Sequence, residues 1–168
     1  VEVKGMAYVG AVGGKNAYAD WTNVKVEVDE SSYVKAHSIE NGNAYRTYVG
    51  GVVGKGDNLI TISNASYNAD ILGKGYVGGI VGYASSPDKT LTLGNITNDS
   101  TTVFTVTGSS NYIGGVVGYA NYIVKTASIV NYQKVISNGN AIGVGGLFGY
   151  ITDTLTITGD LTNNGQIT

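Results

Sequence analysis

The stretch "YVGGIVGYA", residues 76 to 84, decides the fold of this 168-residue chain. Its β-branched and aromatic residues favour strands, whereas its three glycines weaken a strand because glycine has no side chain to pack. Closely similar stretches start at residues 8, 48, 112 and 143, so the chain holds five copies of one motif. Their uneven spacing indicates a repeat protein in which the segments between copies vary as loops do.

The composition agrees with an all-β chain. It includes 26 Gly, 13 Tyr and a single Pro, and no window places apolar residues at helical spacing over three turns. The net charge is −2 with only 13% charged residues, which gives no electrostatic case for binding nucleic acid or an anionic membrane. No apolar run approaches 18 residues, so we expect no membrane insertion. The absence of cysteine excludes disulfides and thiolate metal sites.

Between copies the chain predicts two further strands, for example in "KTLTLGNI" and "TTVFTVTG" after the third copy. Three strands per unit, one of them nearly constant, predict a parallel β-solenoid (β-helix) of about five coils, for which we expect right-handed winding. The expected coils are residues 6–44, 45–75, 76–111, 112–142 and 143–168. We expect residues 1–168 to form a single solenoid segment, cut from a longer protein.

Two motif positions, the third and the seventh, are glycine in every copy, which predicts two glycine ladders at a tight bend or a close backbone approach. The second and fifth positions, such as Val77 and Ile80, are always aliphatic although they have opposite parity. Either a bend at the glycine pair turns both side chains inward or both faces of the strand are covered. We favour the bend.

The motif resembles a known family. It is similar to the GLUG-type repeats of bacterial adhesin-like surface proteins in the stretches "YVGGIVGYA", "YIGGVVGYA" and "VGGLFGY". Gly94-Asn95-Ile96 lies where that family has a Gly-Asn-Val-like strand. The first copy departs from that pattern at Ala11 and Gly13. Similar repeats occur in non-catalytic regions of IgA-specific metallopeptidases. The resemblance implies a secreted, extracellular or cell-surface bacterial protein whose repeats form β-helical spacers.

The tyrosines predict two ladders along the coils. Tyr8, Tyr48, Tyr76 and Tyr112 share the first motif position, while Tyr83, Tyr119 and Tyr150 share the eighth. Stacked rings stabilise the edge of a solenoid, but an exposed aromatic strip also contacts sugars or proteins. Tyr83, Tyr119 and Tyr150 are therefore candidate ligand-contact residues, with a glycan or protein of a host or cell surface as the partner.

The chain offers little catalytic chemistry. His37 is the single histidine, so a histidine-based triad or a zinc site with several histidines is not expected. Asp20, Glu27 and Asp29 could form an acidic patch that holds a cation or a sugar, although we favour a solvated strand rim as their explanation. We predict no catalytic residue, metal or cofactor.

Together these features favour a non-catalytic structural or adhesive segment, acting as a rigid rod or a ligand-presenting scaffold. The alternatives are an accessory spacer of a surface metallopeptidase and, less favoured, a carbohydrate-active β-helix enzyme that uses the acidic patch. Self-association, end to end or through strand edges, is a further expectation.

Overall fold

The computed structural model describes residues 2–5, 7–16, 19–27, 33–36, 47–86, 90–98 and 104–168. These residues form β-strands joined by bends and short turns. Among them there is no helix of the length and apolarity needed to cross a membrane.

The strands form three sheets, named A, B and C here. Sheet A contains β1 (Glu2–Gly5), β2 (Tyr8–Gly10), β6 (Tyr33–Ala36), β7 (Tyr48–Gly50), β10 (Asp70–Leu72), β11 (Tyr76–Gly78), β14 (Thr105–Gly114) and β18 (Lys134–Gly145). Sheet B contains β3 (Gly13–Asn16), β8 (Val53–Asp57), β12 (Val81–Ser85), β15 (Val117–Ala120) and β19 (Phe148–Ile151). Sheet C contains β4 (Ala19–Thr22), β5 (Lys25–Glu27), β9 (Leu59–Asn68), β13 (Thr90–Thr97), β16 (Ile123–Thr126), β17 (Ile129–Asn131), β20 (Leu155–Ile157) and β21 (Leu161–Asn163).

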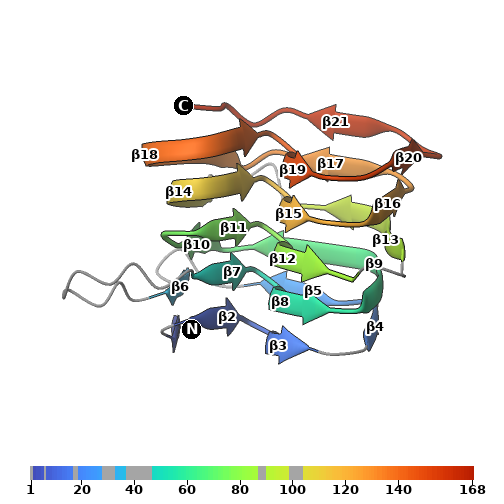
Figure 1. Cartoon of the computed structure of the whole chain (residues 1–168), viewed down its shortest axis with the longest axis horizontal. Coiled ribbons are helices and arrows are strands. Elements are labelled where there is room, and N and C mark those ends of the chain that lie inside the picture. The colour runs from blue at the N-terminus through green and yellow to red at the C-terminus, as the bar shows by residue number, and fades with distance from the viewer. Residues whose placement is uncertain are drawn as a thin grey trace.

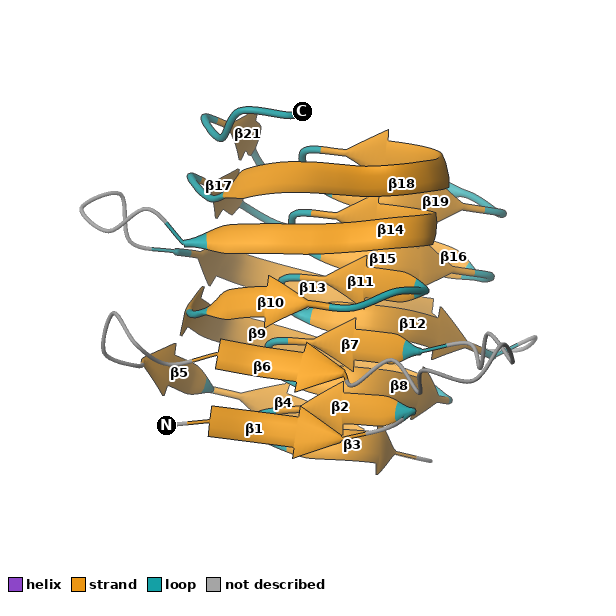
Figure 2. Ribbon diagram, turned by 90° about the vertical axis from the view of Figure 1, so that its left-hand side faces the viewer, coloured by secondary structure: helices purple, strands orange, loops and turns teal. Residues whose placement is uncertain are grey.

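The chain winds through the sheets in turn. It runs from β11 in sheet A through β12 in sheet B and β13 in sheet C, and returns to sheet A as β14. Equivalent strands of successive circuits lie one above the other (Figures 1 and 2). The strand pairs are parallel in all three sheets, as in β11 with β7, β12 with β8 and β13 with β9. The architecture is that of a parallel β-helix, as the repeat predicted.

The motif copies stack in register. Tyr76 pairs with Tyr48 and Val77 with Ile113 in sheet A, while Val81 pairs with Val53 and with Val117 in sheet B. The hydrogen bonding continues through the bend between the two sheets, where the Ile80 amide donates to the Val116 carbonyl at 2.8 Å. Each copy is therefore joined to the next along its whole length.

Each motif copy is divided between two strands by a bend, rather than forming the one strand that we expected, and in the fourth and fifth copies its first half is the end of the long strands β14 and β18. In the third copy the bend comprises residues 79 and 80, between β11 and β12. Val77 and Ile80 are both 0% exposed, so the bend turns both side chains into the core. The favoured explanation for the aliphatic residues of opposite parity is confirmed.

The glycine ladders are explained by close backbone approach at this bend. A Cβ on Gly78 would lie 2.7 Å from the Gly118 amide nitrogen, and one on Gly82 would lie 2.6 Å from the Val49 nitrogen. Such distances are shorter than side chains tolerate, and the neighbouring atoms are backbone, which cannot move aside. The two strands of the corner can pack this closely only because the third and seventh positions lack side chains.

In the third, fourth and fifth copies the fourth motif position is glycine for a different reason. A polar ladder, which we call the inner ladder, comprises Tyr67, Asn98, Asn131 and Asn163, at equivalent places in successive circuits. A Cβ on Gly79 would overlap the Tyr67 ring, and one on Gly115 would lie 2.6 Å from Asn131 Nδ2. The motif corner therefore packs directly against the inner ladder across the interior of the β-helix.

A second asparagine ladder lies at a bend within sheet C. Asn23, Asn64 and Asn95 have positive φ angles of 58°, 49° and 51°, a conformation that asparagine adopts more readily than most residues. Asn95 Nδ2 donates to Asn64 Oδ1 at 3.0 Å, and Asn64 Nδ2 donates to Asn23 Oδ1 at 3.2 Å. Asparagine thus both permits the bend and links three successive circuits.

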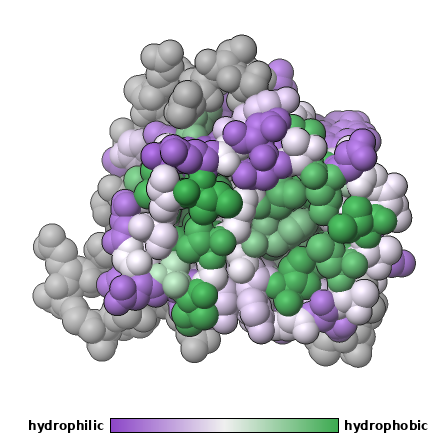
Figure 3. Space-filling view, turned by 90° about the horizontal axis from the view of Figure 1, so that it is seen from above, coloured by the Kyte–Doolittle hydropathy of each residue, from purple (hydrophilic) through white to green (hydrophobic). Residues whose placement is uncertain are grey.

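The core runs up to the strands at the top of Figure 1. Viewed from above, apolar side chains gather on the face formed there (Figure 3). Leu147, Phe148 and Leu155 pack against the core but are only partly buried, whereas their counterparts Val116, Val117 and Val124 are 0% exposed. The interior therefore has the same apolar character along the length of the stack.

Candidate functional site

The most distinctive surface of the molecule is a cluster of seven tyrosines, which we call the tyrosine strip. It comprises Tyr8, Tyr48, Tyr76, Tyr83, Tyr112, Tyr119 and Tyr150. The strip has two columns, one of first-position and one of eighth-position tyrosines, and rings within a column stack on one another. The centroids of Tyr48 and Tyr76 are 5.1 Å apart with an interplanar angle of 6°. Tyr83 and Tyr119 are 4.9 Å apart with an angle of 9°. The in-register stacking of the motif places these rings one above the other.

The two predicted ladders lie in contact and form one surface. Tyr76 is 5.0 Å from Tyr83 with an interplanar angle of 82°, and 5.5 Å from Tyr119 with an angle of 75°. Around Tyr76, rings that are parallel within a column and nearly perpendicular between the two columns give a herringbone arrangement, which suits the quadrupole of aromatic rings. Tyr112 departs from it, because its ring is tilted by 41° to Tyr76 and stacks on Tyr150 at 4.7 Å with an angle of 21°. The bend at the glycine pair causes the contact between the columns, because it folds the two ends of the motif together.

Exposure differs along the strip. Tyr76 is 7% exposed and serves as the base of the cluster, whereas Tyr8 and Tyr150 are 43% and 45% exposed. The candidate residues Tyr83 and Tyr119 are half-buried. All three candidate tyrosines therefore have surface that a ligand can contact, while their remaining surface stabilises the cluster.

Burial and neighbouring rings affect the acidity of Tyr119, in the middle of the strip. Burial raises the pKa of Tyr119, and the adjacent Tyr83, Tyr76, Tyr112 and Tyr150 raise it further because ionised phenols close together would repel one another. The Tyr119 hydroxyl therefore keeps its proton at neutral pH and can donate a hydrogen bond.

Two lysines replace tyrosine at the eighth position in the first two copies. Lys15 Nζ lies 5.7 Å from the centroid of the Tyr8 ring, and Lys55 Nζ lies 5.9 Å and 5.6 Å from those of Tyr48 and Tyr83. These are cation–π distances. One end of the strip is therefore positively charged, and the other is made of tyrosine alone.

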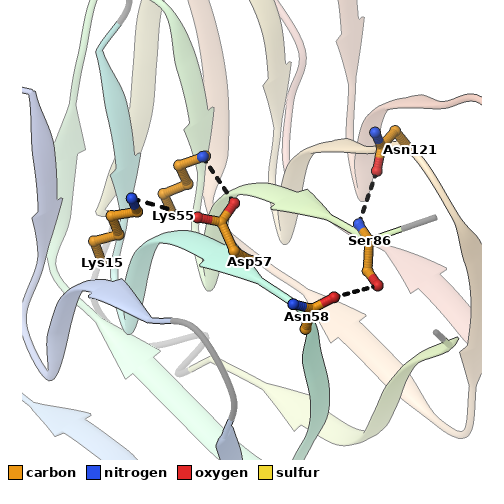
Figure 4. A network of polar contacts seen from close by, with 6 residues as sticks. All are labelled: Lys15, Lys55, Asp57, Asn58, Ser86 and Asn121. Carbon is orange, nitrogen blue, oxygen red and sulfur yellow. Dashed lines mark hydrogen bonds and ion pairs between the residues drawn. The ribbon is translucent and has the colours of Figure 1, made fainter. Parts of the chain in front are cut away.

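A single carboxylate lies between the two lysines (Figure 4). Lys55 Nζ is 2.7 Å from Asp57 Oδ1, and Lys15 Nζ is 3.5 Å from Asp57 Oδ2. Burial of Lys55 acts to lower its pKa, but the hydrogen bond and the charge of Asp57 outweigh burial and raise that pKa. Lys55 is thus held tightly by Asp57, whereas Lys15, whose side chain is 53% exposed, is held loosely.

Polar contacts continue from Asp57 along the turn that follows sheet B. Ser86 Oγ donates to Asn58 Oδ1 at 2.6 Å, and the Ser86 amide donates to Asn121 Oδ1 at 3.1 Å. Figure 4 shows these residues beside the lysine–aspartate group. They tie three circuits together and fix the turn beside the strip.

The predicted acidic patch is only partly described. Asp29 lies outside the described residues, as does His37. Asp20 is exposed on β4 and aligns with Thr61, while Glu27 ends β5 and aligns with Asn68. These partners are seven positions apart along β9, so the backbone does not bring Asp20 and Glu27 side by side. Among the described residues no group of three or more His, Cys, Asp or Glu could hold a metal ion.

Reasoning from sequence missed both the lysine–aspartate group and the inner ladder. The sequence did contain an indication of the lysine–aspartate group, because Lys15 and Lys55 occupy a motif position that is tyrosine in the other copies. The inner ladder gave a weaker signal, since Tyr67, Asn98, Asn131 and Asn163 lie in segments of unequal length where asparagine is also common in turns.

Comparison with known proteins gives one structural relative and no sequence relative. No protein-family model matches the chain, and no curated protein matches it significantly. A crystal structure of a "putative immunoglobulin A1 protease" from Bacteroides ovatus superimposes with a TM-score of 0.51 over 97% of this chain, at 14% identity. The chain spans 59% of the length of that protein. The likeness supports the fold, and the resemblance to GLUG-type repeats continues to rest on the motif residues.

Proposed function

We propose that this chain is a non-catalytic structural and adhesive repeat segment of a secreted or surface-anchored bacterial protein. It forms a stiff rod of about five coils, wound right-handedly, that presents the tyrosine strip to a partner outside the cell. The partner is a glycan or a protein on a host or cell surface.

The observation that supports this proposal is the in-register stacking of the motif. Backbone hydrogen bonds join successive copies even through the bend, as between Val52 and Ile80 and between Val116 and Leu147. Bending such a stack would break several of these bonds at once, so the segment resists bending. The same stacking repeats any surface residue along the rod, which gives the tyrosine strip its length.

A glycan array with the purified 168-residue chain tests the adhesive part. Binding that is lost in the double variant Tyr83→Ala plus Tyr119→Ala, and kept in Tyr132→Ala, supports the strip as the contact surface. Tyr132 is a suitable control because it is 41% exposed and makes no ring contact with the strip. Binding that is unchanged in the double variant would exclude the strip. Polysaccharide turnover that is lost in Glu27→Gln would overturn the non-catalytic assignment.

A second candidate is an accessory spacer within a surface metallopeptidase. The fold likeness to the Bacteroides ovatus protein favours it, since that protein is described as a "putative immunoglobulin A1 protease". The gene that encodes the full protein distinguishes the two. A zinc-protease motif in the same reading frame supports the spacer, whereas a surface anchor without a protease domain supports the adhesive segment.

A further inference from the structure

We propose that the tyrosine strip binds an acidic glycan, with sugar rings lying across the tyrosines and a carboxylate or sulfate of the glycan meeting Lys15. This proposal deepens the adhesive function proposed above and rests on it. Three features of the strip lead to this ligand class. The rings lie in contact with no gap between them, the central strands beneath them are hydrogen-bonded on both sides, and Asp57 lies closer to Lys55 than to Lys15.

The contact between rings decides the shape of the ligand. Neighbouring centroids in the strip are 4.7 to 5.9 Å apart, so no side chain fits between them. Peptides that bind aromatic surfaces, such as proline-rich segments, insert side chains into grooves between separated rings. A ligand of this strip must instead lie on top of it, with a flat apolar face and polar groups at its periphery. Sugar rings have that shape.

Beneath the centre of the strip, the backbone excludes the other common way of binding a peptide, whereas β2, β3 and β19, which carry Tyr8, Lys15 and Tyr150, are edge strands of their sheets. β11 is paired with β7 on one side and with β14 on the other, and β12 is paired in the same way with β8 and β15. Neither strand has a free edge to which an extended peptide could add. At the centre of the strip, recognition therefore depends on the tyrosine rings and their hydroxyls, with the charged group at one end.

The charges at one end decide the preference for an acid. Lys15 and Lys55 share one carboxylate, so the group of three carries a net positive charge on a chain with a net charge of −2. Asp57 is committed to Lys55 at 2.7 Å, whereas it reaches Lys15 only at 3.5 Å. Lys15 also lies over Tyr8, the exposed ring at this end of the strip. An anionic group bound beside Tyr8 would complete the pairing of Lys15.

The test compares two matched sugars by calorimetric titration of the 168-residue chain. One is a linear tetrasaccharide of galacturonic acid, and the other is the same tetrasaccharide after reduction of its carboxyl groups. We expect the acid to bind at least about fivefold more tightly than the neutral form, which corresponds to about 1 kcal/mol for a surface ion pair. Added salt should remove this difference and leave the neutral affinity unchanged.

Two pairs of variants assign the binding to the strip. Lys15→Gln should lower the affinity for the acid about fivefold without affecting the neutral sugar, whereas Lys125→Gln, which removes an exposed lysine on sheet C, should change neither. Tyr119→Ala should weaken both sugars, and Tyr132→Ala neither. Because Tyr119→Ala loosens the cluster, Lys15→Gln keeps the test valid if that variant fails to fold.

The outcomes are distinct. Equal affinity for both sugars, lost in Tyr119→Ala, would overturn the acidic preference and leave the adhesive function standing. Binding of neither sugar at millimolar concentration, or binding that survives Tyr119→Ala, would overturn the site. Binding of a proline-rich peptide in place of both sugars would also overturn it.

Discussion

Two ladders run along this β-helix, one inside and one outside, and both arise from the same stacking of equivalent residues. The inner ladder makes specific hydrogen bonds: Asn131 accepts from Tyr67 and Asn98, and it donates to the Gly146 carbonyl and to Asn163. The tyrosine strip outside is held by ring contacts, which are less directional and leave part of each outer ring exposed. The inner ladder is therefore specialised for holding the fold, and the outer one has surface left for recognition.

The largest expected effect concerns the glycine that packs against the inner ladder. Gly115→Ala would place a Cβ against the Gly146 carbonyl and 2.6 Å from Asn131 Nδ2. We expect the free energy of unfolding to fall by about 3–5 kcal/mol, because backbone atoms cannot move aside. Urea denaturation measures this. Gly13→Ala is the control, since its Cβ would meet only Trp21 at 3.6 Å, and it should change stability by less than about 0.5 kcal/mol.

Removing the central member of the inner ladder should have the next largest effect. Asn131 is 0% exposed, and Asn131→Ala would remove its buried hydrogen bonds with Tyr67, with Asn98 Nδ2 and with the Gln133 amide. We expect a loss of about 2–3 kcal/mol. The exposed counterpart Asn163→Ala should cost about 1 kcal/mol or less. Equal losses in the two variants would contradict the role of burial in the inner ladder.

Alkaline pH should lower the free energy of unfolding through the buried Tyr67 of the inner ladder. Burial raises the pKa of Tyr67, although its hydrogen bond to Asn98 acts in the opposite direction. Above the reference pKa of 10.0 the unfolded chain loses this proton while the folded chain keeps it, so stability falls as pH rises. The loss should be about 1.4 kcal/mol per pH unit for this residue, until the folded pKa is passed. Below pH 10 the contribution is complete.

Thermal unfolding followed between pH 8 and pH 11 measures this loss. Tyr67→Phe should be less stable at neutral pH because it removes the donor to the Gly115 carbonyl, and its stability should depend less on pH above 10. If Tyr67→Phe shows the same pH dependence as the unaltered chain, the effect belongs to other groups. The first of these to test is Tyr122, because burial raises its pKa as well.

The smallest expected effect concerns the outer ladder. Tyr119→Ala removes the ring between Tyr83 and Tyr150 and should lower the free energy of unfolding by about 1 kcal/mol, because the ring is partly exposed and its contacts are non-directional. Tyr119→Phe, which keeps the ring, should be nearly neutral. A loss for Tyr119→Ala as large as that for Asn131→Ala would mean that the strip, too, serves mainly to hold the fold.

The architecture could be predicted well from the sequence because the repeated strand motif determines how the coils stack. In-register copies of a strand motif leave few ways to bury Val77 and its counterparts other than parallel stacking. Less of the candidate site could be predicted, because Tyr76 and Tyr83 are seven residues apart and come together only through the bend at residues 79 and 80. That bend also makes two strands of what alternation alone presents as one.

The amino-acid sequence by itself determined that the chain is all-β and repetitive, that a bend occurs at the glycine pair, and that two sets of tyrosines recur. Only the tertiary structure decided that these sets join into one aromatic surface, that Asp57 lies between two lysines at one end of it, and that Gly79 and Gly115 pack against the inner ladder. The physical reason is that periodicity fixes which residues recur along the axis, whereas contacts around the axis depend on how sharply the chain turns at each corner.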